Sequence, residues 1–481
     1  MSVGAWRVAE VRAAEDVLMA RLPEGTLMQR AAAGLAARCV RLLGGAYGAR
    51  VLLLVGAGNN GGDALYAGAR LARRGARVDA LLLNPQRVHA GGLAALRTAG
   101  GSIVDVCPST VDMMLDGIVG IGGTGGLRAD AASIVAQARA AARIVVAVDV
   151  PSGVDADTGA VAGDAVEADV TVTFGCLKPG LVVGAGAAHA GYVDLVDIGL
   201  TLPDPPALRI PTHADVSGWW PRPGRESDKY TRGVVGVATG SATYPGAAVL
   251  SVAGAGTGPA GLVRYAGSAA DAVRRHHPSV IATASVAEAG RVQAWTCGSG
   301  LGTGEDAVRE VNAVLAANVP VCLDADALTL LAAGAVSGNP TVLTPHDREY
   351  ARLAGAPPGP DRVAAALDLA RKLQVTVLLK GDRTVVAAPD GTVWVNPTGT
   401  SALATGGTGD VLAGLLGALL AAGLPADRAA VAAAYVHGLA GRHAADGGPV
   451  TATDVAAALR PTLARLLPAP ERPRPAPEDR R

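Results

Sequence analysis

The sequence has few aromatic residues and no net charge. The first limits how its cores can be built, and the second argues against some classes of partner. Aromatic residues make up 3% of the 481 positions, with Phe174 the only phenylalanine, whereas 50% of the residues are hydrophobic. The cores must therefore be built mainly from Ala, Val and Leu. Lys plus Arg (42) balances Asp plus Glu (42). A nucleic-acid-binding or membrane-surface protein would favour a basic surplus, so we expect neither kind of partner.

Cysteine and long apolar runs are also scarce. The five cysteines form no CxxC pair and no cluster with histidine, which argues against a zinc site or a disulfide framework. No apolar run of about 18 residues is free of glycine and charge. The N-terminus lacks the basic and apolar regions of a signal peptide. We therefore expect a soluble, cytoplasmic protein.

Strand-like apolar runs alternate with helix-like segments in two successive sets. This alternation is typical of α/β folds, in which helices cover both faces of a parallel sheet. The first set has expected strands at Val51–Val55, Val78–Leu83, Gly117–Gly120, Ile144–Val148 and Val170–Phe174. The second set has them at 233–239, 294–297, 319–324, 341–344 and 376–380, followed by a hairpin over 384–395. Helices are expected within 1–45, over 64–74 and from Asp410 onward.

A proline-rich stretch separates the two sets. Six prolines interrupt any periodic pattern between residues 200 and 230. We predict a first domain over residues 1–205, a linker over 206–226 and a second domain over 227–467. The last residues, 468–481, are rich in Pro, Arg, Glu and Asp, so a disordered tail is predicted there.

The first set carries three polar turns at expected strand ends, where open α/β sheets bind their ligands. The turn GAGNNGGD (56–63) supplies amide oxygens that suit a monovalent cation or a ribose hydroxyl; the alternative is a tight turn with capping residues. Asp116 precedes a second glycine-rich turn over 120–126. Asp149 follows a third strand, and Lys178 either reaches the same crevice or is a solvated surface lysine.

These turns, with DVPSGVDADTG at 149–159, resemble the N-terminal epimerase domain of the NAD(P)H-hydrate repair family over roughly residues 1–200. The resemblance implies a Rossmann-like αβα sandwich, with Asp149 and Lys178 as catalytic residues. It also implies a K⁺ ion held by Asn60, Asp116 and Ser152. The family's GTG turn reads Gly-Ile-Gly here. The implied contacts of the hydrated dinucleotide are Asn59, Asn60, Gly61, Gly62, Asp63, Gly120, Ile121, Gly122, Gly123, Thr124, Gly125, Gly126 and Asp149.

The second set contains TGGTGD (405–410), directly before an apolar helix-like run. Glycines at a helix N-terminus aim bare N–H groups at one point, which makes an anion site. Asp410 is then either a base for a hydroxyl that attacks a phosphoryl group, or a carboxylate favoured by the helix dipole. GSGLG (298–302), Asp324-Ala325-Asp326, TPHD (344–347) and KGDRT (380–384) follow other strands. Taken singly, His346, Lys380 and the GSGLG turn each have a structural explanation, but all can converge on one sheet edge.

Together these segments resemble the ADP/ATP-dependent NAD(P)H-hydrate dehydratase, a ribokinase-like αβα sandwich, over about residues 225–465. The resemblance implies Mg²⁺ and ADP or ATP as reaction partners. It implies substrate contacts at Ala247, Gly300, His346 and Asp410, with Asp410 catalytic. The implied nucleotide contacts are Lys380, Gly381, Asp382, Arg383, Thr384, Thr400, Ser401, Ala402, Leu403, Ala404, Thr405, Gly406, Gly407, Thr408 and Gly409.

The two resemblances together imply a bifunctional repair enzyme that self-associates and acts on small molecules. The first domain would interconvert the R and S epimers of hydrated NADH or NADPH. The second would convert the S epimer to NAD(P)H. Hydroxide is a poor leaving group, but once the hydroxyl is phosphorylated it can leave readily as phosphate. Two alternatives remain open. A ribokinase-type small-molecule kinase with a degenerate N-terminal domain would release a stable phosphorylated product. A dinucleotide-binding regulatory protein would bind its ligand without turnover.

Overall fold

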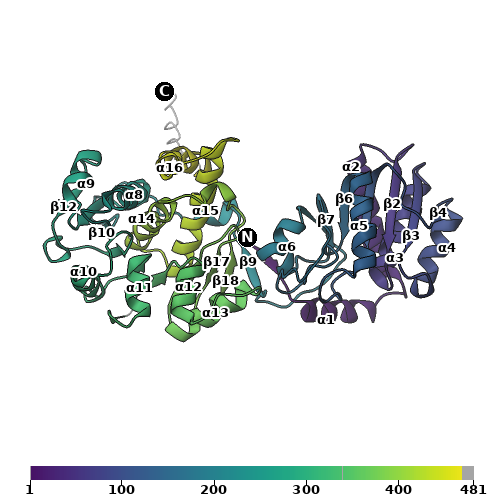
Figure 1. Cartoon of the computed structure of the whole chain (residues 1–481), viewed down its shortest axis with the longest axis horizontal. Helices are drawn as coiled ribbons and strands as arrows, with labels where there is room; N and C mark the ends of the chain where they lie inside the picture. The colour runs from purple at the N-terminus through teal and green to yellow at the C-terminus, as the bar shows by residue number, and fades with distance from the viewer. Residues whose placement is uncertain (1, 339, 468–481) are drawn as a thin grey trace, which may run out of the picture. The chain divides into compact units, whose positions relative to one another are not determined.

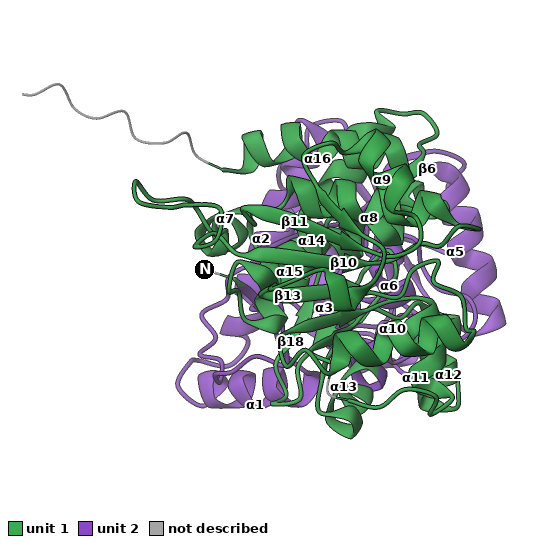
Figure 2. Ribbon diagram, turned by 90° about the vertical axis from the view of Figure 1, so that its left-hand side faces the viewer, with its two compact units in different colours: residues 1–2, 211–357, 366–481 green, residues 3–210, 358–365 purple. Residues whose placement is uncertain are grey.

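A computed structural model describes residues 2–338 and 340–467. The chain forms two compact units (Figure 2). The N-terminal unit contains residues 3–210 and 358–365, and the C-terminal unit contains residues 211–357 and continues from 366. The boundary near residue 210 falls within the stretch that the prolines predict as a linker. The predicted tail, 468–481, lies outside the described residues.

The N-terminal unit is built on a seven-stranded parallel sheet with the order β4-β3-β2-β5-β6-β7-β8 (Figure 1). Its strands are β2 (Arg50–Val55), β3 (Arg77–Leu82), β4 (Ser102–Val104), β5 (Val111–Gly117), β6 (Ala142–Val148), β7 (Val170–Phe174) and β8 (Tyr192–Val196). Two short strands, β1 (Val3–Ala5) and β9 (Leu208–Ile210), pair antiparallel with each other. The helices are α1 (Val8–Met19), α2 (Thr26–Leu43), α3 (Asn59–Ala72), α4 (Ala90–Thr98), α5 (Ala129–Ala141) and α6 (Gly184–His189).

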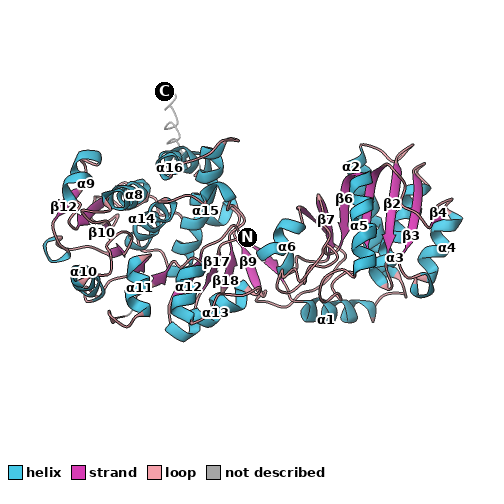
Figure 3. Cartoon of the chain, in the orientation of Figure 1, coloured by secondary structure: helices cyan, strands magenta, loops and turns pink. Residues whose placement is uncertain are grey.

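The central strand β2 shows why this unit is a sandwich. Its residues 51–55 are all apolar and buried, as expected of a strand covered on both faces. Alternate side chains enter different cores: Leu53 packs in a cluster with Leu35 of α2 and Leu65 of α3, whereas Leu54 packs in a cluster with Val135 of α5. Helices therefore cover both faces of the sheet (Figure 3).

The C-terminal unit has its own sheet, with the order β18-β17-β16-β15-β14-β13-β10-β11-β12. The strands from β12 to β16 are parallel, and β16-β17-β18 is an antiparallel meander. The strands are β10 (Val234–Ala238), β11 (Leu262–Ala266), β12 (Ile281–Thr283), β13 (Ala294–Cys297), β14 (Val321–Leu323), β15 (Val342–Leu343), β16 (Thr376–Leu379), β17 (Val385–Ala387) and β18 (Val393–Val395). The helices are α7 (His213–Trp219), α8 (Pro245–Thr257), α9 (Ala270–His276), α10 (Glu305–Leu315), α11 (Asp326–Ala332), α12 (Asp347–Ala354), α13 (Arg362–Leu373), α14 (Thr408–Ala421), α15 (Ala426–Ala445) and α16 (Ala452–Leu466).

Helix α14 is the central helix of the C-terminal unit, and glycines let it lie directly against α8. A methyl group on Gly414 would come within 1.9 Å of the Ser251 carbonyl oxygen, and one on Gly254 within 2.1 Å of the Val411 carbonyl oxygen. The residues of α14 from Val411 to Ala421 are all buried, as expected of a helix that is apolar on every side. This packing fixes the position of the α14 N-terminus, where the TGGTGD turn lies.

Several element boundaries differ from the sequence predictions. The strand expected at Gly117–Gly120 is wrong, because β5 ends at Gly117 and residues 118–120 form the following turn. The strand over 111–117 was not predicted because two aspartates, Asp112 and Asp116, interrupt its apolar pattern. Helix α3 starts at Asn59, so the NNGGD residues form its first turns rather than a preceding loop. The predicted linker contains β9 and α7, and the unit continues with strands β11 and β12, which had no counterpart among the predictions.

Two candidate active sites

The first candidate site is a cavity of about 1000 Å³ in the N-terminal unit. The segments that follow β2, β5 and β6 line it, so it lies at the carboxyl edge of the sheet, where such folds bind ligands. Of the predicted contacts, those that line it are Asn59, Asn60, Asp63, Gly120, Ile121, Gly122 and Asp149. Helix α1 and the residues after it complete the lining, among them Arg12, Glu15 and Glu24.

Asp149 and Lys178 form a buried ion pair in this site. Lys178 Nζ lies 2.5 Å from Asp149 Oδ1 and also donates to Thr173 Oγ1 (2.9 Å) and the Phe174 carbonyl oxygen (2.9 Å). The Lys178 side chain is 1% exposed and that of Asp149 is 12% exposed. All three ammonium protons therefore have acceptors within the protein. The solvated-lysine interpretation of Lys178 is wrong.

Asp149 also has an unusual backbone. Its φ of 67° lies in the left-handed region, which is uncommon for a residue other than glycine. Its Oδ1 accepts from the Thr173 hydroxyl (3.0 Å) and the Phe174 amide (3.2 Å) in addition to Lys178. Three donors therefore converge on one carboxylate oxygen and hold it at the edge of the cavity.

The three predicted K⁺ ligands lie together beneath the second glycine turn. Asp116 is fully buried and accepts hydrogen bonds from the Ser152 amide (2.8 Å) and the Ser152 hydroxyl (2.6 Å). Burial raises the pKa of Asp116 to about 6, although hydrogen bonds from Ser152 and Ile118 lower it. A methyl group on Gly120 would lie 3.0 Å from Asn60 Oδ1, so that amide oxygen faces the same turn. This set of carboxylate, hydroxyl and amide oxygens fits a monovalent cation, which would offset the buried charge.

Two further acidic side chains line the cavity. Asp63 is 9% exposed and its Oδ1 has no hydrogen-bond partner. Burial raises the pKa of Asp63 well above its usual range, and the charges of Asp149 and Glu15 raise it further. Burial also raises the pKa of Glu15, with the charge of Asp149 as the next contribution. Burial and neighbouring negative charge therefore raise the pKa of both carboxyl groups.

Some predicted contacts have a packing role in this structure. A methyl group on Gly61 would lie 2.5 Å from the Gly56 carbonyl oxygen, and one on Gly62 would meet the His89 ring at 3.0 Å. These two glycines let the first turn of α3 approach its neighbours. The remaining predicted contacts of the second turn, Gly123, Thr124, Gly125 and Gly126, are not among the lining residues described for this cavity.

The second candidate site lies at the N-terminus of α14. Gly407 caps the helix with a φ of 90°, a conformation that favours glycine. A methyl group on Gly406 would meet no atom within 4 Å, so the turn is open at this point. A methyl group on Gly409 would lie 3.7 Å from both Asp324 Oδ2 and Lys380 Nζ. The turn therefore presents helix N–H groups to open space beside a buried carboxylate and an ammonium.

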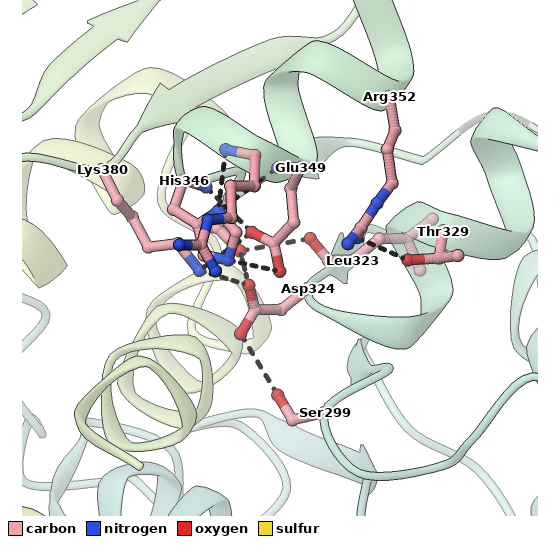
Figure 4. A network of polar contacts seen from close by, with 10 residues as sticks. Ser299, Leu323, Asp324, Thr329, His346, Glu349, Arg352 and Lys380 are labelled. Carbon is pink, nitrogen blue, oxygen red and sulfur yellow. Dashed lines mark hydrogen bonds and ion pairs between the residues drawn. The ribbon is translucent and has the colours of Figure 1, made fainter. Parts of the chain in front are cut away.

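Lys380 is held by two carboxylates (Figure 4). Its Nζ lies 2.8 Å from Asp324 Oδ1 and 3.5 Å from Glu349 Oε2. Asp324 also accepts from the Thr344 hydroxyl (2.8 Å) and the Ser299 hydroxyl (3.1 Å). Burial would lower the pKa of Lys380, but Asp324 and Glu349 outweigh it, so the pKa lies above its ordinary value. The ammonium is thus charged and fixed beside the glycine turn.

Asp410 lies in the first turn of α14, beside this network. Burial raises its pKa to about 7, and the charge of Asp324 contributes to the rise, while Ser299 and Lys380 lower it. A carboxyl group with this pKa can exchange a proton near neutral pH, as a general base requires. The helix-dipole alternative predicts a stabilised, strongly acidic carboxylate, which is the opposite of this environment.

His346 lies just outside this network, as the N-cap of α12. Its Nδ1 accepts from the Arg348 amide (3.1 Å) and the Glu349 amide (3.2 Å), while its Nε2 lies 3.5 Å from Glu349 Oε1. The side chain is 49% exposed. His346 therefore orients Glu349 and the start of α12, and its exposed ring edge remains available to a ligand.

The two predicted nucleotide segments lie close together in the C-terminal unit. A methyl group on Gly399 would lie 1.9 Å from the Asp382 carbonyl oxygen, and Arg383 donates to the Pro397 carbonyl oxygen at 2.8 Å. The Thr408 hydroxyl donates to the Leu403 carbonyl oxygen (2.8 Å), which closes the turn before α14. The hairpin after β16 therefore places 380–384 beside 397–400.

The remaining predicted substrate contacts, Ala247 and Gly300, adjoin each other. A methyl group on Gly300, whose φ is 67°, would lie 2.8 Å from Ala247 Cβ. The turn after β13 and the first turn of α8 are therefore packed together.

The sequence interpretation missed several polar residues at these sites. Glu15 and Glu349 lie on helices that no glycine-rich turn precedes in the sequence. Ser299 was noted only as part of a turn. The TPHxxE spacing, with Glu349 three residues after His346, is a capping-box pattern and was the available signal. Glu15 had no such signal.

Two searches of the described residues gave negative results. Within residues 2–338 and 340–467, no group of three or more His, Cys, Asp or Glu side chains is arranged to hold a metal ion. In the same part of the chain, none of the helices combines the length and apolar character that crossing a membrane would require.

Known protein families match both units of the chain. One family model, described as NAD(P)H-hydrate dehydratase, matches residues 235–461, and another, described as YjeF-related protein N-terminus, matches residues 24–180. The bifunctional NAD(P)H-hydrate repair enzyme Nnr of Mycobacterium leprae (strain TN) is 52% identical over 474 residues, which cover 96% of this chain and 99% of the relative. An NAD(P)H-hydrate epimerase of Clavibacter michiganensis subsp. michiganensis (strain NCPPB 382) is 44% identical over 216 residues, covering 41% of this chain and 91% of the relative.

A solved structure bears on the C-terminal unit. A ribokinase-like superfamily protein from Enterococcus faecalis V583 is 25% identical, with a TM-score of 0.51, and the match covers 56% of this chain and 99% of that protein. The predicted ribokinase-like fold is confirmed. Because both family models match in one chain and a relative of nearly equal extent shares half its residues, the chain belongs to the family of bifunctional NAD(P)H-hydrate repair enzymes.

Proposed function

We propose that the chain repairs hydrated NADH and NADPH by two successive reactions. The N-terminal unit interconverts the R and S epimers of the hydrate. The C-terminal unit dehydrates the S epimer to NAD(P)H, with ADP or ATP as the phosphoryl donor. The observation that carries the proposal is Asp410, which lies in the glycine turn at the N-terminus of α14 and whose pKa burial raises to about 7.

The dehydration follows from the chemistry of the leaving group. The hydroxyl on C6 of the nicotinamide ring attacks the terminal phosphoryl group of the nucleotide while Asp410 takes its proton. The bond from that phosphorus to the bridging oxygen breaks, so AMP leaves when ADP is the donor and ADP leaves when ATP is the donor. The electron pair of ring nitrogen N1 then expels inorganic phosphate from C6. Loss of a proton from C5 restores the dihydropyridine ring. The N–H groups of the 406–409 turn stabilise the charge that develops on the phosphoryl oxygens.

The nucleotide fits between the two segments that the sequence predicts. Lys380 supplies a positive charge, and the α14 N-terminus supplies N–H groups beside open space at Gly406. Mg²⁺ is expected to arrive with the nucleotide and to be held mainly by its phosphates, since the described residues offer no preformed cluster of ligands. The ion neutralises phosphate charge, which the acidic groups Asp324 and Asp410 would otherwise repel.

The epimerase site is proposed to act through Asp149. Lys178 forms an ion pair with this carboxylate and orients it, and Asn59, Asn60 and Asp63 line the same cavity. Asn60, Asp116 and Ser152 would hold K⁺, which supplies positive charge near the bound dinucleotide. Two observations support this assignment: Asp116 is buried with no cationic partner among the described residues, and Asn60 Oδ1 faces the turn at Gly120. We also expect the protein to be cytoplasmic and to form a homo-oligomer. Light scattering would test the oligomeric state.

The test is the absorbance at 340 nm of an epimer mixture of NADH hydrate with the protein, K⁺, Mg²⁺ and ADP or ATP. Full recovery of the NADH signal supports both activities. Recovery that stops at the S fraction would contradict the epimerase assignment. A stable phosphorylated product without recovery would instead identify a small-molecule kinase, and binding without turnover would identify a regulatory protein.

A further inference from the structure

Helix α1 lies outside the residues that the N-terminal family model matches, 24–180, yet it forms part of the epimerase cavity. Arg12, Glu15 and Met19 of this helix all line the cavity, at the spacing of one helical face. A methyl group on Gly122 would lie 3.0 Å from Arg12 Nη2, so α1 lies directly against the second glycine turn.

The chain that leads into α1 is tied to the loops that carry the catalytic pair. The Trp6 amide donates to the Leu177 carbonyl oxygen (3.0 Å), next to Lys178. The Val8 amide donates to Asp157 Oδ1 (2.7 Å), within the segment that begins at Asp149. The position of α1 is therefore fixed relative to Asp149 and Lys178, and Glu15 of this helix lines the cavity beside them.

Glu15 and Asp149 have opposite environments. Three donors hold Asp149 Oδ1, among them the Lys178 ammonium. Glu15 is partly buried, and no hydrogen bond or ion pair of its carboxyl group is found among the described residues. Burial and the nearby charge of Asp149 raise the pKa of Glu15 and favour its protonated form. Two carboxyl groups whose environments separate them in this way are suited to acid and base roles.

Exchange of the hydroxyl at C6 needs both roles. The C6–O bond breaks as the N1 electron pair forms a C6=N1 double bond, and the departing hydroxide takes a proton and leaves as water. A water molecule then adds to the opposite face of C6 and gives up one proton. One proton is donated and one is accepted, so the total charge of the site is unchanged.

We propose that Glu15 is a further catalytic residue of the epimerase site, the acid that protonates the departing C6 hydroxyl while Asp149 accepts the proton of the incoming water. This proposal rests on the proposed epimerase function. Asp63 is less suited to the role, because its Oδ1 is shielded from solvent within the first turns of α3, whereas Glu15 is a longer side chain on the cavity wall.

The pH dependence of the reaction follows from the groups around Glu15. Protonation of Glu15 is required, so the epimerisation rate falls as the pH rises through the pKa of Glu15 in the folded protein. The titratable and charged groups that face Glu15 or share its cavity are Arg12, Asp16, Glu24, Asp63, His89, Asp149 and Lys178.

The experiment compares Glu15→Gln with Asp16→Asn, a control on the same helix whose side chain is exposed and does not line the cavity. Epimerisation of an R-enriched hydrate is followed by chromatography without nucleotide, so that dehydration does not occur. Nucleotide is then added, and dehydration of the S epimer at 340 nm reports the C-terminal unit of the same molecules. Glu15→Gln should lower epimerisation about 100-fold or more and abolish its fall at high pH. Asp16→Asn should keep the rate at low pH and keep the fall, which should move slightly to lower pH because the charge of Asp16 raises the pKa of Glu15.

A Glu15→Asp variant separates chemistry from folding, because it keeps an acid one methylene shorter. It should retain the fall at high pH, with a rate between those of the wild type and Glu15→Gln. An unchanged rate and pH profile in Glu15→Gln, or a folded Glu15→Asp variant without the fall at high pH, would overturn the proposal. If the wild-type protein did not epimerise at all, the epimerase function itself would fail, which is a separate outcome.

Discussion

Replacing Lys178 with methionine removes a buried ammonium while keeping most of the side-chain volume. The carboxylate of Asp149, whose side chain is 12% exposed, would lose its counter-ion and its closest hydrogen-bond donor. The Thr173 hydroxyl and the Phe174 carbonyl would also lose a partner. Breaking a buried ion pair by removing one member costs about 3–5 kcal/mol, so we expect a loss of this size in the N-terminal unit.

The Lys178→Met/Asp149→Asn double variant provides the internal control. It removes both charges, and asparagine tolerates the left-handed backbone that Asp149 adopts with its φ of 67°. The double variant should therefore recover most of the stability lost by Lys178→Met, although neither variant should epimerise. If the two variants were equally destabilised, the uncompensated charge would not be the cause.

Hydrogen exchange measured by mass spectrometry suits this test, because it resolves the two units separately. Peptides covering β6 and β7 should exchange faster in Lys178→Met, and those covering α14 should be unchanged. A loss below about 1 kcal/mol at β6 and β7 would refute the reasoning, since it would mean that Asp149 is adequately solvated without Lys178.

Three further predictions concern other residues. Asp410→Asn should abolish S-epimer dehydration, and in the wild type the rate should fall about tenfold per pH unit below 7, because the base must be ionised. The pKa of Asp410 in the folded protein, about 7, lies above the ordinary value for an aspartate, 3.8, so stability is lost as the pH rises from about 4 through 7. Asp410→Asn should therefore stabilise the C-terminal unit at pH 8 by less than about 4 kcal/mol, and thermal unfolding with no gain would contradict this. Replacing K⁺ with tetramethylammonium should slow epimerisation but not dehydration, and Asp116→Asn should do the same; equal effects on both activities would argue against the cation site. Gly298→Ala should reduce soluble expression or thermal stability, because its methyl group would lie 1.9 Å from the Asp324 carbonyl oxygen and its φ is 130°; a fully stable variant would show that β13 and β14 can separate.

The sequence by itself determined much of the local structure and the family. Glycine-rich turns encode local backbone geometry, so the positions of GAGNNGGD and DVPSGVDADTG at strand ends, and of TGGTGD at the start of a helix, were predictable. The ends of β7 and β13 match the predicted strands at 170–174 and 294–297, because neither run contains a charged residue. The run at 111–117 was missed, because its two aspartates disrupt the apolar pattern.

Only the tertiary structure decided which charges are buried together. Lys178 pairs with a residue 29 positions away and Lys380 with one 56 positions away, and neither spacing leaves a periodic signal in the sequence. The same holds for Glu15, which reaches its cavity because α1 is anchored to loops about 150 residues further along the chain. Periodicity and turn chemistry are local properties, whereas burial and electrostatic partners arise only when distant segments pack, and these set the acid and base strength of the catalytic groups.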